Sequence, residues 1–150
     1  MLDDAPFGFL LIDSARLLRA RFDRALDDAQ LGLTAGEARA LFHVHFHEPS
    51  RQTALAARMG VEPMTLVGFL DRLEAAGLVV REPDPTDRRA KIVRLTGQAQ
   101  AFLERAMAVT RGVREAALKD FSPDEIDLFR TMLARLRTRL LEDERHGVTP

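Results

Sequence analysis

The sequence LAARMGVEPMTLVGFL, residues 55–70, has the spacing of two short helices joined by a tight turn. It places the small Ala56 before Gly60, and after the turn the apolar Leu66 and Phe69 are expected to face inward on a second helix. A small residue lets two helices cross closely, and glycine can adopt the positive φ that a tight turn between them requires. Pro63 has a fixed φ that suits the first turn of a second helix. The spacing predicts a helix-turn-helix, although the same turn also occurs in helical proteins that do not bind DNA.

Helices are predicted around this motif. The sequence TAGE at residues 34–37 is a capping box, which predicts a helix over residues 35–47. Ser50 is expected to cap a short helix over residues 51–59, and the helix that begins at Pro63 should end before Gly77.

After Gly77 the period of the pattern changes from 3.6 to about 2. Residues 78–83 (LVVREP) and 91–96 (KIVRLT) are rich in β-branched side chains and flank PDPTD, which predicts two strands joined by a longer loop. Residues 88–94 carry four cations and no anion. A basic hairpin beside a recognition helix predicts contacts with DNA backbone or minor groove. The alternative is a solvated turn with a local pair between Asp87 and an arginine.

The two ends of the chain are predicted to be amphipathic helices. One covers about residues 6–29, a second begins with Thr96 as its cap and ends near residue 119, and SPDE at residues 122–125 is a capping box for a third. The apolar stripe of the last helix consists of Ile126, Phe129, Leu133, Leu136 and Leu140. Periodicity alone allows this stripe to face either a partner or the core of the same chain.

Composition limits the classes of function. A chain of 150 residues fits one domain, and the absence of cysteine excludes disulfides and thiolate-held zinc. There is no long uncharged apolar run and no secretory signal pattern, so we expect no membrane partner and a cytoplasmic location. No nucleophile-base pair or phosphate loop is present, and we expect neither an enzyme nor a cofactor.

The segment LDRLEAAGLVVREPDPTDRRAKIVRLT, residues 70–96, resembles the hallmark segment of the MarR family of bacterial transcriptional regulators, with its Asp-x-Arg pattern at Asp87 and Arg89. The neighbouring VEPMTLV and DRRAK are most similar to the SlyA-like branch. The resemblance implies a mainly α (α+β) fold in a single domain, residues 1–150. A winged helix-turn-helix lobe at about 34–96 would bind DNA, and helices at about 6–30 and 97–142 would form a dimerisation region.

The resemblance further implies a homodimer that binds a pseudo-palindromic double-stranded operator. It would act as a repressor that a small aromatic or phenolic effector releases from the operator. The residues assigned to DNA contact are Pro63, Met64, Thr65, Gly68, Arg72, Arg88, Arg89 and Lys91. Gly68 stands where the SlyA-like branch usually has arginine, which predicts an altered or relaxed operator preference. If base reading is lost, the alternative is a winged-helix protein that acts through protein contacts.

The sequence FHVHFHE, residues 42–48, contains three histidines at alternate positions. On a helix His45 faces away from His43 and His47, so the three cannot bind one metal together, and no metal site is predicted. A clip formed by His43 and His47 would make a metal-responsive regulator and remains an alternative. For an effector carboxylate we expect Arg16 or Arg19 as the cationic partner and His45 as a hydrogen-bonding partner. Glu37 and Ala38 stand where many relatives have Gln-Trp, so the identity of the effector does not carry over.

Overall fold

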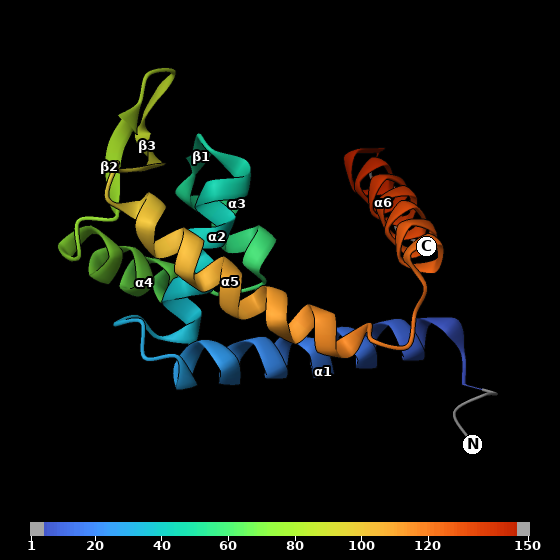
Figure 1. Cartoon of the computed structure of the whole chain (residues 1–150). Coiled ribbons are helices and arrows are strands. Elements are labelled where there is room, and N and C mark those ends of the chain that lie inside the picture. The colour runs from blue at the N-terminus through green and yellow to red at the C-terminus, as the bar shows by residue number, and fades with distance from the viewer. Residues whose placement is uncertain (1–4, 147–150) are drawn as a thin grey trace. The chain divides into compact units, whose positions relative to one another are not determined.

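The computed structural model describes residues 5–146, and the chain divides into two compact units, one up to Val113 and one from Arg114 on. The elements in chain order are α1 (Phe7–Asp28), α2 (Ala35–His47), β1 (Ser50–Arg51), α3 (Gln52–Met59), α4 (Pro63–Ala75), β2 (Val79–Asp84), β3 (Asp87–Leu95), α5 (Ala99–Ala117) and α6 (Pro123–His146) (Figure 1). The expected mainly helical fold with a small sheet is confirmed.

The helix-turn-helix consists of α3 and α4 and has the predicted turn. Gly60 ends α3 in the left-handed conformation, with φ of 63°, and Pro63 stands in the first turn of α4. Helix α2 begins with the predicted capping box, in which Thr34 and Glu37 each bond to the other's backbone N–H. These ends agree with the sequence because caps and turns depend on local residues.

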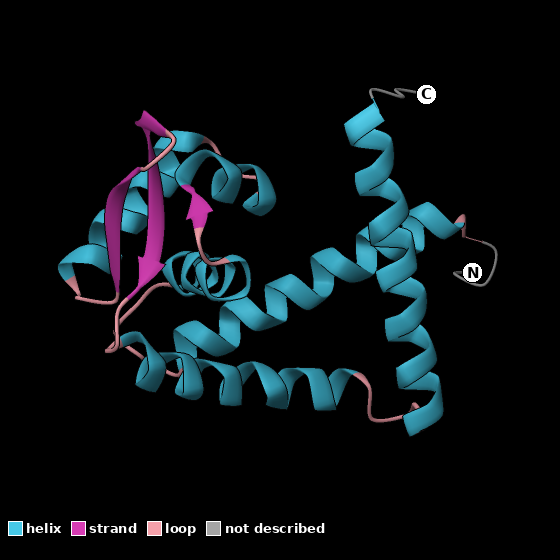
Figure 2. Ribbon diagram, turned by 90° about the horizontal axis from the view of Figure 1, so that it is seen from above, coloured by secondary structure: helices cyan, strands magenta, loops and turns pink. Residues whose placement is uncertain are grey.

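The sheet has the strand order β1-β3-β2 and all its pairs are antiparallel (Figure 2). Asp84 pairs with Asp87, so only two residues connect β2 to β3, and the expected longer loop is wrong. The cations of RRAK therefore lie on β3 itself. The prediction that Ser50 caps α3 is also wrong, since Ser50 belongs to β1, pairs with Val93 and donates its hydroxyl to the His47 carbonyl.

One apolar core holds the helix-turn-helix in place. Its fully buried large side chains are Leu26, Leu41, Val44, Leu55, Leu66, Leu70, Leu73, Val79, Val93 and Leu103. Burial of each such side chain stabilises the fold by about 1.5–3 kcal/mol. The first half of α5 closes this core with Phe102 and Ala106. The prediction that Thr96 caps α5 is wrong, since α5 begins only at Ala99 and the Thr96 hydroxyl donates to the Gly77 carbonyl.

The second unit contains α6, which begins with the predicted capping box. The Ser122 N–H donates to Glu125 at 2.7 Å, and the Glu125 N–H donates to the Ser122 hydroxyl at 3.3 Å. Its large exposed apolar side chains are Leu128, Phe129, Met132, Leu133 and Leu140. Among residues 5–146, no helix is long and apolar enough to cross a membrane.

Candidate nucleic-acid interface

Helix α4 presents an uncharged first turn to solvent. Pro63, Met64 and Thr65 are all exposed, and the Met64 side chain is 77% exposed. On the opposite face Leu66 and Leu70 are fully buried, which fixes the orientation of the helix. The three residues predicted to read bases at the start of α4 therefore share a surface that DNA could contact.

Gly68 lies one turn further along α4. A Cβ added at this position would meet no atom within 4 Å, and the backbone there is not strained. The glycine is therefore not required by packing, and the helix surface is open at this point.

Arg72, the last residue predicted to read bases from α4, contacts another helix. Its Nε donates to the carboxylate of Glu37, which is buried and also accepts a hydrogen bond from the Thr34 N–H at 3.0 Å. The Arg72 guanidinium carbon lies 6.0 Å from the centre of the Phe69 ring. The structure thus assigns Arg72 a contact within the lobe, although its side chain remains 59% exposed.

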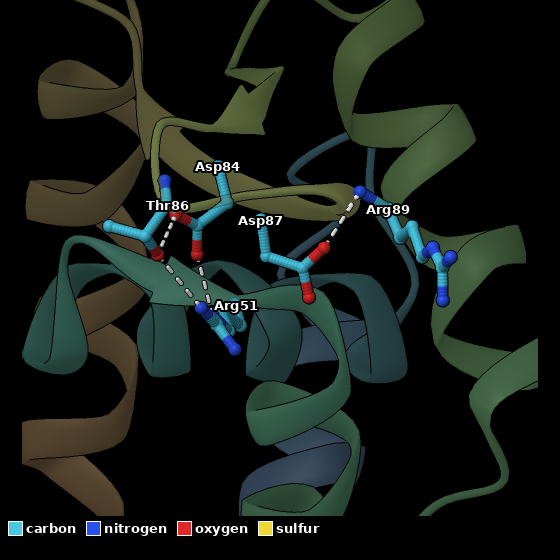
Figure 3. Close-up of polar contacts among 5 residues, drawn as sticks. All are labelled: Arg51, Asp84, Thr86, Asp87 and Arg89. Carbon is cyan, nitrogen blue, oxygen red and sulfur yellow. Dashed lines mark hydrogen bonds and ion pairs between the residues drawn. The ribbon is translucent and has the colours of Figure 1, made fainter.

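A compact polar network holds the turn of the wing, the hairpin of β2 and β3 (Figure 3). Asp84 accepts from the Thr86 N–H at 2.8 Å, from the Thr86 hydroxyl at 2.7 Å and from Arg51 Nε at 2.6 Å. These contacts, the Thr86 N–H first, lower the pKa of Asp84 to about 2. Because Arg51 lies on β1, the network ties the hairpin turn to the edge of the helix-turn-helix.

Three cations of the wing have no ion-pair partner among the described residues. Asp87 accepts from the Arg89 backbone N–H at 3.0 Å, and the Arg89 side chain extends away from the network in Figure 3. Arg88, Arg89 and Lys91 are exposed, and none has an ion-pair partner within residues 5–146. The alternative of a local side-chain pair between Asp87 and an arginine is therefore wrong.

A second network connects the wing to α4. Arg81 on β2 contacts Asp71 at 2.6 Å and Glu74 at 2.7 Å, and its hydrogen bonds lower the pKa of the Glu74 carboxyl. Sequence reasoning missed this arginine and also Arg51. The charged residues of each pair are evident in the sequence, but no local pattern indicates that the two side chains contact each other.

Two of the residues expected to bind an effector have contacts with neighbours on their own helices. Arg16 pairs with Asp13 on its own helix at 2.7 Å. His45 is half-buried and packs its ring against Phe46, and no hydrogen bond joins it to Arg16 or Arg19 among the described residues.

The histidine beside Arg19 is His43. Burial lowers the pKa of His43 first, followed by the charges of His47, Arg19, Arg58 and Arg39. Its ring stacks on that of His47 at 5.9 Å, and its Nδ1 is buried without a hydrogen-bond partner. The predicted shared face of His43 and His47 is confirmed, but no group of three potential metal ligands occurs in the part of the chain that is described.

The order of helices and strands, with a turn between α3 and α4 and a basic hairpin after them, defines a winged helix-turn-helix DNA-binding fold. A family model described as the MarR family matches residues 33–91. A solved structure described as MarR is 29% identical, with a TM-score of 0.81, over 97% of this chain and 98% of that chain.

Two further solved relatives contain ligands. A MarR family protein from Mycobacterium tuberculosis in complex with salicylic acid is 31% identical, with a TM-score of 0.71, over 91% of this chain and 99% of that one. CouR from Rhodococcus jostii RHA1, bound to p-coumaroyl-CoA, is 26% identical, also with a TM-score of 0.71, over 91% and 94%. The chain belongs to the MarR family of transcriptional regulators.

Proposed function

We propose that the protein is a homodimeric repressor that binds a pseudo-palindromic operator and is released from it by an aromatic or phenolic effector. It would act in the cytoplasm and belong to the SlyA-like branch of the family. The observation that carries the proposal is the set of exposed wing cations, Arg88, Arg89 and Lys91, which have no ion-pair partner in the part of the chain that is described. They lie in the same lobe as the exposed first turn of α4. Such a lobe can neutralise phosphates with the wing while a helix enters the major groove.

The terminal helices supply the surface for a second copy. Exposed apolar side chains occur on α1 at Phe7, Phe9 and Ile12, and on α6 at Phe129 and Leu140. Contiguous exposed apolar side chains mark interaction sites in soluble proteins. We assign dimerisation to about residues 6–30 and 97–142 and DNA binding to about residues 34–96. A two-fold axis would then set two lobes on half-sites about one helical turn apart.

An anionic effector is favoured by the cations around His43. The charges of three arginines lower the pKa of this imidazole, and they come from three helices: Arg19 from α1, Arg39 from α2 and Arg58 from α3. Arg39 is compensated by Asp23 at 2.5 Å, whereas Arg19 has no ion-pair partner among the described residues. A carboxylate ligand would pair with Arg19 and accept a hydrogen bond from an imidazole. The ligands of the two relatives carry aromatic groups, which supports this class of effector.

A second candidate function is suggested by Gly68 and by the engagement of Arg72 with Glu37. Both features reduce the number of side chains on α4 that can bond to bases, so a winged helix that acts through protein contacts remains the alternative. Selection of genomic fragments by the purified protein separates the two. We expect enrichment of a few sites with two-fold symmetry. Equal and weak recovery of all fragments would favour the alternative.

A further inference from the structure

The exposed face of α4 has an unusual chemistry for a helix that reads DNA. Its first turn presents Met64 and Thr65, and its second turn presents Gly68. Of the side-chain groups at these positions, the only polar one is the Thr65 hydroxyl. Resting on the proposed DNA-binding function, we infer that α4 reads A·T pairs through the C5-methyl groups of thymine, and that Met64 is the main contact.

Met64 is suited to this contact by its position and exposure. Its side chain is 77% exposed, on the same turn as the exposed Thr65, while the neighbouring Leu66 is fully buried and fixes the helix. In the major groove the thymine methyl is the one apolar group that identifies a base pair. A flexible thioether side chain can adjust to such a group and remove it from water.

Gly68 adds room for a close approach. No atom lies within 4 Å of the position that its Cβ would occupy. Because Gly68 has no side chain, the helix backbone beside Met64 is uncovered. A side chain at this position would hold the helix backbone further from the bases. Glycine therefore favours contact between the first turn of α4 and the floor of the groove.

Cations that could read guanine are missing from this face. The bidentate contact of arginine or lysine with guanine is the commonest specific contact in the major groove. Arg72 is the only arginine or lysine on α4, and it is bonded to the buried Glu37. Its release toward a base would leave a buried carboxylate without its cation, which is unfavourable.

The charge of the wing also favours DNA that is rich in A·T pairs. A·T tracts have a narrow minor groove whose strong negative potential attracts arginine. Arg88 and Arg89 are exposed and have no ion-pair partner in the described part of the chain. Helix and wing would therefore both favour A·T pairs, one by methyl contact and the other by groove shape.

Replacement of thymine by uracil tests the inference, because it removes only the C5-methyl group. The DNA is a fragment that the protein selects from its genome, with thymines of one half-site replaced in turn, and binding is measured by fluorescence anisotropy. We expect wild-type protein to lose about fourfold in affinity for each contacted methyl. Met64→Ala should bind the thymine DNA more weakly and become insensitive to the substitution at the position that Met64 contacts. Met64→Leu, which keeps an apolar side chain, should remain sensitive.

Three results would overturn the inference. Uracil could leave the affinity of the wild type unchanged, the loss could be equal in wild type and Met64→Ala, or the selected half-site could contain only G·C pairs where α4 binds. Failure of the proposed function looks different, because the protein would then select no DNA at all. Met64 is exposed, so its substitution should leave the unfolding midpoint unchanged, and this control shows that the variants are folded.

Discussion

Glu37 in the first turn of α2 and Arg72 in the third turn of α4 form an ion pair in which the carboxylate is buried and the guanidinium is half in solvent. Glu37 also completes the capping box of α2 with Thr34. One carboxylate thus stabilises the start of α2 and fixes the helix that is proposed to read DNA. Because of this contact, Arg72 is bonded within the protein although it lies on an exposed part of α4.

The pair should be visible in the free energy of unfolding. Arg72→Met leaves the buried carboxylate without its cation and should cost about 1–3 kcal/mol, toward the lower end because Arg72 is partly solvated. Glu37→Gln keeps the capping contact in part and should cost less. Urea unfolding of both variants and of the double variant measures the coupling. Strictly additive losses would show that the two side chains do not interact.

Two glycines should respond oppositely to alanine. A Cβ on Gly36 would lie 2.6 Å from Cζ of Phe69, so Gly36→Ala should displace that ring and cost about 1–3 kcal/mol. Gly68→Ala meets no neighbour and should raise stability by about 1 kcal/mol or less, because alanine favours the helix. Thermal unfolding compares them directly. Equal shifts in the same direction would contradict the packing described for α2 against α4.

The wing cations should determine the salt dependence of DNA binding. Arg88→Gln, Arg89→Gln or Lys91→Gln should each reduce the slope of log affinity against log salt by about 1 if the side chain neutralises one phosphate. Arg16→Gln is the matched control, since it removes the same charge from α1, where Arg16 pairs with Asp13. Anisotropy titrations at several salt concentrations provide the slopes. A control slope that falls as much as those of the wing variants would exclude a specific role for the wing.

Stability should fall in mild acid because of His43. Its pKa is lowered in the folded protein from the usual 6.5, by burial first, and so the unfolded chain binds more protons as the pH decreases. The neutral imidazole therefore favours the fold above about pH 6.5, and this contribution is lost as the pH falls through the lowered folded-state pKa. His43→Gln should flatten the profile of unfolding free energy between pH 7 and 5. Parallel profiles for wild type and variant would exclude His43 as the cause.

Several local features were predictable from the sequence, although the caps expected at Ser50 and Thr96 were wrong, and distant contacts were not predictable. The turn at Gly60 and the capping boxes at Thr34 and Ser122 follow from residues within four positions of one another. The strand β1 has only two residues and exists because Ser50 and Arg51 pair with β3, about 40 positions away. No local pattern indicates such a strand.

The same reason applies to the candidate site. The exposed residues of α4 and the wing could be assigned from spacing, whereas the contacts Glu37–Arg72 and Arg51–Asp84 join residues 35 and 33 positions apart. The Asx turn of Asp84 with Thr86 was the one local sign of the wing network, within the sequence PDPTD. The assignment of Arg16, Arg19 and His45 to an effector stays a prediction, with His43 as the histidine that the structure sets near Arg19.

Two copies of this winged helix are proposed to bind one symmetric operator. The most direct test of this proposal is the stoichiometry and specificity of binding to a DNA fragment selected from the genome, measured by anisotropy at physiological salt against a scrambled fragment of equal length. Two chains per operator are predicted, with affinity for the operator at least about a thousandfold above that for scrambled DNA. One chain per site, or equal affinity for both fragments, would contradict the account.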